Sequence, residues 1–361
     1  MAFELGATQW KLGLTVGLGQ RARLRTIAAG DLAALEKELG KARTRFDLPT
    51  SSPVMSCYEA GADGFWLHRC LIEQGIRNLV VDSSSIEVRR RAKRVKTDRL
   101  DVGKLVEMLV RYDLGETRVW SVVRVPGVEE EDNRHLHREL VSLKRERTRI
   151  GNRIRGLLAA HGVKLPVKKD FAEQLKSVRL WDGSRLPAAL HCRLLREQER
   201  LKLVGQQIRE LEAERAELVR EWQGQEADKV RQLLLLRGVG INSAWLYVME
   251  LFAWRKFANR RELGSLAGLT PTPYQSGSSR REQGISKAGN RHVRGMAIEL
   301  AWCWLHFQPG SQLSRWFRKR FGRGSTRIRK IGIVAVARKL LIALWRYLET
   351  GEVPAGAAVQ A

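Results

Sequence analysis

Cysteine is scarce in this sequence, and its spacing excludes the common cysteine-based sites. The four cysteines are Cys57, Cys70, Cys192 and Cys303, and no two of them form a CxxC pair. No histidine lies at zinc-finger spacing from a cysteine pair, so the sequence does not predict a structural zinc site. We expect free thiols in a reducing compartment.

Long apolar segments are also missing. The longest apolar stretch, Ile331 to Leu348, is interrupted by Arg338, Lys339 and Arg346. A membrane-spanning helix needs about 20 predominantly apolar residues, so this stretch predicts a core helix and no membrane partner. No N-terminal signal peptide is visible, because Met1 leads straight into a short strand-like stretch.

Acidic residues are few relative to basic ones. The 361 residues include 65 Lys and Arg against 39 Asp and Glu, which gives a formal net charge of +26. A protein this basic repels itself unless an acidic partner neutralises it, and nucleic acid is the usual partner. An anionic membrane surface is the alternative. Hydrophobic residues make up 43% of the chain, which excludes wholesale disorder.

Residues 1 to about 125 alternate strand and helix patterns. Trp10 to Val16 and Arg21 to Ala28 predict two strands joined by a turn at Gly17–Gly19. The other predicted strands and helices are Val54 to Tyr58, Asn78 to Asp82 and Arg118 to Val125 (strands), and Leu32 to Arg43 and Gly64 to Gln74 (helices). This order predicts an α/β domain whose sheet contains parallel pairs and is covered by helices.

From Val128 to about Trp222 the apolar residues change to heptad spacing. Two such helices are joined by a segment that contains Pro166, Gly183 and Pro187. The pattern predicts a coiled-coil helical hairpin or one arm of a dimer, with a plain helical spacer as the alternative.

From Val230 the chain is again compact and mostly α-helical. Leu233 to Glu250 reads as two helices around the turn Gly238-Val239-Gly240. This pattern resembles a helix-hairpin-helix element, whose turn amides can hold a backbone phosphate.

Four acids stand where a metal site would need them. Asp98 and Asp101 are three residues apart and share one face of a predicted helix. Glu59 ends a buried strand, and Glu4 ends the short first strand. Acids at the ends of neighbouring strands together with a helical pair are the arrangement that holds two divalent metals in ribonuclease-H-like nucleases. The alternative is a surface Asp pair that forms salt bridges with nearby arginines.

A serine-rich segment offers a nucleophile. Ser276, Ser278 and Ser279 lie in a predicted loop with Arg280 and Arg281 beside them. A serine hydroxyl attacks phosphorus only if its proton is removed and cations stabilise the developing charge. A flexible polar loop is the alternative.

Basic residues gather in three stretches. Residues 311–330 hold eight Lys or Arg and no acid, with Trp316, Phe317 and Phe321 between them. Such a mixture suits neutralisation of phosphates and stacking on bases, although a solvated helix face gives the same pattern. The predicted nucleic-acid-binding residues are Arg89, Arg90, Arg91, Lys93, Arg94, Lys96, Arg280, Arg281, Lys287, Arg315, Arg318, Lys319 and Arg320.

Taken in order, these motifs resemble the DEDD transposases of bacterial insertion sequences, the one-ten group and in particular its eleven-eleven branch. The matching segments cover nearly the whole chain. They are Cys57–Gly61, Gly64–Leu67, Val80–Asp82, Arg94–Asp101, Val122–Glu131, Arg237–Gly240, Ala267–Pro271, Gln275–Gly277 and Gly284–Asn290.

The resemblance implies a fold and a set of site residues. It implies a RuvC-like catalytic domain over 1–127, a coiled-coil region over 128–229, a mostly α-helical transposase domain over 230–350 and a tail over 351–361. The acidic tetrad of the family falls on Glu4, Glu59, Asp98 and Asp101, and its serine nucleophile falls on Ser276. The first acid of the family is usually Asp, and Glu4 is one methylene longer.

The resemblance also implies an activity and its partners. The family moves its own insertion element by RNA-guided DNA recombination, through a covalent 5′-phosphoserine intermediate at a site that the acids and the serine form together. Implied partners are Mg²⁺ (Mn²⁺ as the alternative), donor and target DNA, a structured bridge RNA and further copies of the chain in a dimer or tetramer. The implied location is the bacterial cytoplasm, in association with the nucleoid.

Two other functions remain open at this point. One is a RuvC-like, structure-specific DNA endonuclease (a Holliday-junction resolvase), in which metal-activated water attacks and Ser276 is idle. The other is a non-catalytic RNA-binding scaffold.

Overall fold

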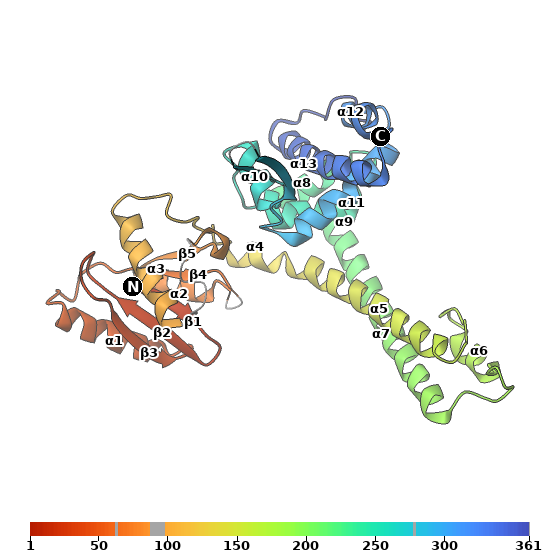
Figure 1. Ribbon diagram of the computed structural model, residues 1–361, viewed down its shortest axis with the longest axis horizontal. Coiled ribbons are helices and arrows are strands. Elements are labelled where there is room, and N and C mark those ends of the chain that lie inside the picture. The colour runs from red at the N-terminus through yellow and green to blue at the C-terminus, as the bar shows by residue number, and fades with distance from the viewer. Residues whose placement is uncertain (62–63, 87–97, 277–278, 361) are drawn as a thin grey trace. The chain divides into compact units, whose positions relative to one another are not determined.

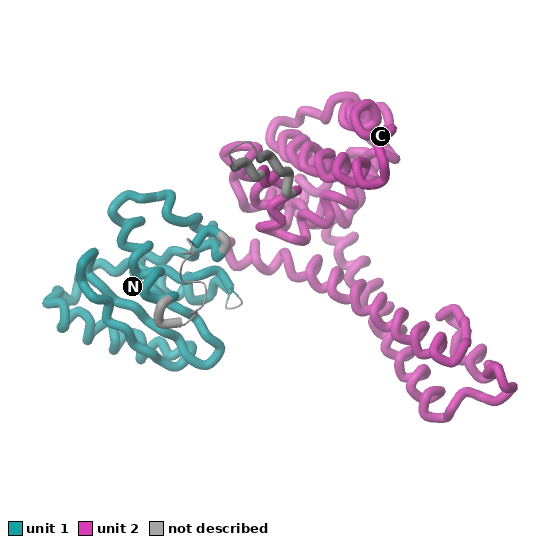
Figure 2. The backbone as a smooth tube through the Cα atoms, in the orientation of Figure 1, with its two compact units in different colours: residues 1–125 teal, residues 126–361 magenta. Residues whose placement is uncertain are grey.

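A computed structural model describes residues 1–361 except 62–63, 87–97, 277–278 and 361, and except the side chains of residues 84, 98–100, 274–276 and 279–283. The chain divides into two compact units, Met1–Val125 and Pro126–Ala361 (Figure 2). Each unit has its own hydrophobic cores, as expected of segments that fold around separate apolar clusters.

The first unit is built on a mixed five-stranded sheet with the order β3-β2-β1-β4-β5 (Figure 1). The strands are β1 (Ala2–Leu5), β2 (Gln9–Leu14), β3 (Arg23–Ala28), β4 (Met55–Glu59) and β5 (Arg77–Val81). β1, β4 and β5 run parallel, whereas β2 and β3 run antiparallel to their neighbours. The β2–β3 hairpin and the parallel pairs match the predicted alternation of strands and helices.

Helices cover both faces of this sheet. On one face, Phe3, Tyr58 and Val80 pack into one cluster with residues of α1 (Leu32–Arg45) and α2 (Trp66–Glu73). On the other face, the preceding or following residues Ala2, Cys57 and Val81 pack against α3 (Asp98–Asp113). Since successive side chains of a strand point to opposite faces, this alternation fixes the face of every neighbouring residue.

The predicted strand over Arg118 to Val125 is wrong. This segment makes only an isolated bridge, between Val122 and Val81. Two backbone hydrogen bonds accompany it, from the amide of Asp82 to the carbonyl of Ser121 at 2.9 Å and from the amide of Val123 to the carbonyl of Val80 at 2.7 Å. They are too few for a ladder, and Trp120 packs in the α3 cluster.

The second unit begins with a long helical arm. Its elements are α4 (Val128–Asp132), α5 (His135–Ala159), α6 (Phe171–Ser177) and α7 (Ala188–Glu221) (Figure 1). Two ion pairs show that α5 and α7 pack antiparallel. Lys144 meets Glu212 at 2.6 Å, and Arg153, later in α5, meets Glu197, earlier in α7, at 3.3 Å. Apolar heptad residues, among them Leu140, Ile154 and Val204, form the seam between them.

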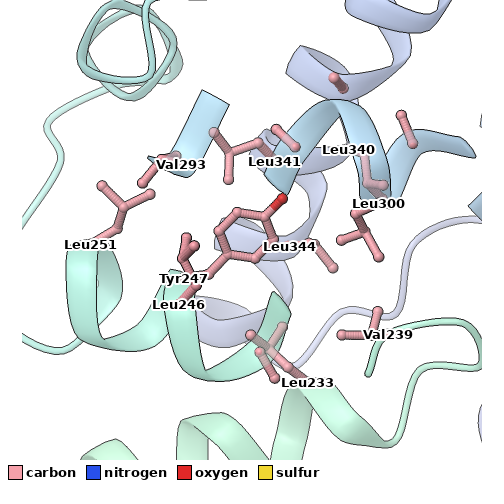
Figure 3. Close-up of a cluster of buried hydrophobic side chains, with 14 of the residues drawn as sticks. Leu233, Val239, Leu246, Tyr247, Leu251, Val293, Leu300, Leu340, Leu341 and Leu344 are labelled. Atoms are coloured by element: carbon pink, nitrogen blue, oxygen red, sulfur yellow. The ribbon is translucent and has the colours of Figure 1, made fainter. Parts of the chain in front are cut away.

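The rest of the second unit packs around one large apolar cluster (Figure 3). Its elements are α8 (Gln225–Leu234), α9 (Ile241–Tyr247), the π-helical segment η3 (Val248–Phe252), α10 (Arg260–Leu266), β6 (Pro271–Ser276), β7 (Ser279–Ile285), α11 (Arg291–Phe307), α12 (Gln312–Phe321) and α13 (Thr326–Thr350). Tyr247 lies within this cluster, beside Leu300 and Leu344 of α11 and α13.

The C-terminal residues also join this unit. The amide of Arg237 donates to the carbonyl of Ala358 at 3.1 Å, and the amide of Gln360 donates to that of Leu235 at 2.6 Å. In the part of the chain that the structure describes, no helix is long and apolar enough to span a bilayer.

The predicted loop around Ser276 is instead a β-hairpin. β6 and β7 pair antiparallel from Pro271↔Ile285 to Ser276↔Ser279. Small polar residues and two prolines gave this segment the pattern of a loop. Proline is nevertheless tolerated at the first residue of a strand and at an irregular register, and Pro271 and Pro273 occupy these positions.

Candidate catalytic and nucleic-acid sites

Glu4 and Glu59 occupy matching positions on adjacent parallel strands. β1 and β4 pair Ala2 with Cys57 and Phe3 with Tyr58, so the next residue on each strand is one of the two acids. Alternation along the strands places both acids on the face that Ala2 and Cys57 present to α3. Both strands end here, so the two acids mark one edge of the sheet.

The direction of α3 brings Asp101 to the same edge. The C-terminal part of α3 lines a cavity of about 470 Å³ with Met1 and Met55, at the opposite, N-terminal ends of β1 and β4. Midway along α3, the thiol of Cys57 lies 3.9 Å from the carbonyl of Leu105. From Leu105, Asp101 lies four residues back along the helix, a rise of about 6 Å. From Cys57, Glu59 lies two residues ahead along β4, a rise of about 6.6 Å in the same direction.

Three of the four predicted acids therefore share one end of the sheet. The backbone of Asp98 begins α3 at that end, and its side chain lies outside the described residues. Among described side chains, no three His, Cys, Asp or Glu lie close enough together to hold a metal ion. The tetrad as a metal site stays a prediction. Asp82, which directly follows β5 at the same end, is an acid that the sequence patterns did not assign.

Cys57 belongs to the packing beneath this edge. It is fully buried, and burial raises the pKa of its thiol to about 12. The thiol is therefore neutral and contributes to packing instead of chemistry.

Ser276 ends β6 and is the last residue of that strand to pair, opposite Ser279. Arg280 and Arg281 pair with Gln275 and Tyr274 in the same hairpin. The structure places these residues by their backbone only.

The base of this hairpin is tied to the segment that precedes it. The amides of Ser286, Lys287 and Asn290 donate to the carbonyls of Thr270, Gly268 and Leu266, at 2.9, 3.2 and 2.8 Å. Gly289 has a φ of +89°, and a Cβ atom there would lie 2.1 Å from the carbonyl oxygen of Leu266. Only glycine therefore permits this close approach, which holds the hairpin to α10.

A buried carboxylate connects the arm to the hairpin segment. Glu250, in η3, accepts two hydrogen bonds from Arg138 of α5, at 2.8 and 3.0 Å. It accepts a third, at 2.9 Å, from the side-chain amide of Asn290, which also caps the start of α11. Burial alone would raise the pKa of Glu250, but Arg138, Arg134 and Asn290 hold it below its ordinary value.

The sequence patterns missed this cluster. Glu250 read as the end of a helix, and Asn290 as the end of a polar loop. The available signal was a single acid within an otherwise apolar stretch, since residues 244–252 are all buried in the structure. A charge in such a stretch needs a partner, which only the fold could identify.

Replacement of Glu250 by Ala is expected to lower the free energy of unfolding by about 3 kcal/mol. That is the lower end of the roughly 3–5 kcal/mol for a broken buried pair, because Arg138 is 44% exposed and can be rehydrated. Arg138→Ala should cost more, because it leaves the carboxylate buried. Urea unfolding of both variants and the double variant measures the coupling. Strictly additive effects would contradict the network.

His137 gives stability a dependence on pH. It is 2% exposed, and within the described part of the chain neither ring nitrogen has a hydrogen-bond partner. Burial lowers its pKa to about 4; Arg215, His292 and Arg138 act in the same direction, and Glu250 opposes them. Below about pH 6.5, His137 binds a proton in the unfolded chain but stays neutral in the folded chain. Stability due to this group is therefore present at neutral pH and lost as the pH falls from about 6.5 toward 4.

A His137→Met variant is expected to lose less stability than the parent chain between pH 6.5 and 4.5. The methionine fills a similar volume and does not titrate. Urea unfolding at several pH values measures the slope. Equal slopes in the two proteins would show that other groups cause the acid sensitivity.

The structure describes the predicted basic stretches only in part. Arg89, Arg90, Arg91, Lys93, Arg94 and Lys96 lie outside the described residues. Arg315, Arg318, Lys319 and Arg320 are exposed on α12, as nucleic-acid binding requires. Phe317, however, is buried in the main cluster, and Trp316 and Phe321 pack against it. The helical spacing of these aromatics thus serves packing.

A mixed α/β unit with acids at one edge of its sheet, followed by a helical unit with an exposed basic helix, is typical of a protein that acts on nucleic acid. Comparison with known proteins agrees. Residues 230–315 match the family described as "Transposase IS116/IS110/IS902 family". The chain is 39% identical over 373 residues to "Putative transposase y4rJ" of Sinorhizobium fredii, covering all of this chain and 94% of that protein.

A more distant relative comes from Yersinia enterocolitica. It is named "Transposase for insertion sequence element IS1328" and is 24% identical over 324 residues, covering 88% of this chain and 91% of that protein. The chain belongs to the IS116/IS110/IS902 family of transposases. The function is therefore transposition of an insertion-sequence element, with DNA as the substrate.

Proposed function

We propose that this transposase is an RNA-guided DNA recombinase that cuts and rejoins strands through a covalent bond to Ser276. The observation that carries the proposal is the register of Glu4 and Glu59 at one edge of the sheet, with Asp101 at the same end of α3. Isolated surface acids would have no reason to share one edge and one face.

The acids would hold divalent metal. Their donor set fits, because carboxylate oxygens are the ligands that Mg²⁺ and Mn²⁺ prefer. Glu4, Glu59, Asp98 and Asp101 are the proposed ligands. Bound metal would supply positive charge that stabilises a phosphate under attack.

Ser276 would supply the attacking atom. Its hydroxyl oxygen forms a bond to phosphorus, its proton passes to a base, and the bond from phosphorus to the 3′-oxygen of the neighbouring nucleotide breaks and leaves a 3′-hydroxyl. The product is a 5′-phosphoserine. A 3′-hydroxyl of another strand then attacks the phosphoserine and releases Ser276. The neighbouring Arg280 and Arg281 are the cations proposed to stabilise the phosphate.

A structured RNA would select the donor and target DNA by base pairing. The ordered family motifs support this part of the proposal, and the net charge of +26 suits a protein that must neutralise RNA together with donor and target DNA. A dimer or tetramer would bring together the strands that exchange.

The test uses the full chain purified with its RNA, labelled donor DNA and Mg²⁺. Denaturing electrophoresis should show a protein-linked DNA band, and mass spectrometry of the digested band should find a nucleotide on the peptide that contains Ser276. Ribonuclease treatment beforehand should abolish the band. DNA that is cut without any protein-linked product would favour the endonuclease, in which water attacks.

A further inference from the structure

A large groove lies in the second unit, at the base of the β6–β7 hairpin. Its volume is about 1170 Å³. One wall contains Pro271 and Ile285, the paired residues that begin β6 and end β7. The other walls come from α10 and α13, both labelled in Figure 1, from Trp304 of α11, from residues 311–313 at the start of α12 and from the residues that follow α13.

The lining of this groove contains a set of basic residues, here called the rim. Six cations line it: Arg260, Arg261, Arg327, Arg338, Lys339 and Arg346. Glu352 is the one acid among the described lining residues. None of the six forms an ion pair with any residue that the structure describes. The ammonium of Lys339 lies over the ring of Trp316, 4.9 Å from its centre. A basic rim without acidic partners attracts a polyanion.

The floor of the groove is apolar. Along α13, Ile331, Val334 and Ile342 face into it at helical spacing. Ile331 is 56% exposed, although α13 otherwise packs into the main cluster. Aliphatic side chains and cations without ion-pair partners in the same groove suit a ligand that combines apolar faces with negative charges.

We propose that this groove binds a single-stranded segment of DNA. Duplex DNA presents its phosphates outward and stacks its bases inside, whereas an unpaired strand exposes base faces that can contact an apolar floor while its phosphates meet the rim. The volume exceeds the roughly 300–1,000 Å³ of pockets for single small molecules, so several linked nucleotides fit better than one. An apolar wall also favours deoxyribose, since it leaves the 2′-hydroxyl of RNA without partners.

The position of the groove indicates that the bound DNA belongs to the strand that Ser276 cuts. Ser276 lies five residues along β6 from Pro271, which is about 17 Å in an extended strand. The bound segment would therefore lie within a few nucleotides of the phosphate that Ser276 attacks. The assignment to the strand cut at Ser276 rests on the proposed function. The proposal that the groove binds single-stranded DNA does not.

The test compares two triple variants of the full chain. Arg261, Arg327 and Arg346, all exposed at the rim, change to Ala in the first. Arg318, Lys319 and Arg320 of α12, which do not line the groove, change to Ala in the second. Both lose the same charge. The probes are a labelled 15-nucleotide oligothymidylate, the matching oligouridylate and a duplex of equal length, each titrated over a range of salt.

The rim variant should lower the slope of log K against log salt for oligothymidylate by about two units, at about 0.7 per lost phosphate contact, and should leave the duplex slope unchanged. The α12 variant should not reproduce this selective loss. Ile331→Gln should weaken oligothymidylate binding several-fold without changing the slope, because it alters a base contact and no charge.

Other outcomes would overturn the assignment. An unchanged slope in the rim variant, or the same loss of oligothymidylate binding in both triple variants, would remove the groove as a specific site. Equal dependence of oligouridylate on the rim would assign the groove to RNA, and effective competition by an oligoglutamate peptide would assign it to an acidic protein segment. Ser276→Ala should bind oligothymidylate normally. A parent chain that never forms the protein-linked band, or a band that persists in Ser276→Ala, would with intact groove binding reject the serine mechanism alone.

Discussion

Ser276→Ala is expected to abolish the protein-linked DNA band and strand exchange while RNA and DNA binding persist. The change removes the attacking oxygen and adds no bulk. Loss of a nucleophile from an enzyme that works through a covalent intermediate costs on the order of 10⁶-fold in rate, so no band should be visible. The assay is denaturing electrophoresis of labelled donor DNA after incubation in Mg²⁺.

Ser279→Ala is the matched control. Ser279 pairs directly with Ser276 across the hairpin, so both changes remove one hydroxyl from the same pair of strand ends. The control should retain the band. A band that survives in Ser276→Ala and disappears in Ser279→Ala would keep the chemistry and move the nucleophile across the hairpin.

Asp101→Asn is expected to reduce recombination by about 100- to 1,000-fold, the usual effect of removing one group that stabilises charge in a transition state. Asn has nearly the same shape as Asp and lacks its charge, so the protein should remain folded. Glu59→Gln should act in the same way, since Glu59 lies at the same edge. Recombination rates and urea unfolding, measured on the same preparations, separate chemistry from stability.

Asp113→Asn provides the control for this prediction. It removes the same charge from the same helix, but Asp113 is exposed at the opposite end of α3, beside the cavity at the N-terminal ends of the strands. Recombination in this variant should match the parent chain. Near-normal recombination in Asp101→Asn would reject the metal-site assignment for this end of the sheet.

Much of the first unit could be predicted from local patterns. The alternating residues of β2 and β3 and the turn between them identify a hairpin, because period-two alternation and glycine act over a few residues. Its helices also appear within a few residues of their predicted bounds. The strand predicted over Arg118 to Val125 is reduced to one bridge with Val81, because completing a ladder depends on a neighbouring strand that no local pattern identifies.

The acids show how far sequence reasoning reaches at the site. Their types and local positions were visible, at strand ends and on one helical face. The pairing of β1 with β4, which sets Glu4 beside Glu59, joins segments more than fifty residues apart. The direction of α3, which carries Asp101 to the same edge, likewise depends on packing across the whole sheet.

The sequence by itself determined the class of partner, most of the order of strands and helices in the first unit, and the residues able to do chemistry. These follow from charge, from short-range periodicity and from the chemistry of side chains. Only the tertiary structure decided which of them meet. The link from Arg138 through Glu250 to Asn290 and the groove lined by residues from 260 to 355 both join distant segments. Such contacts form because burial and charge pairing stabilise the whole folded chain, and no short window of sequence contains both partners.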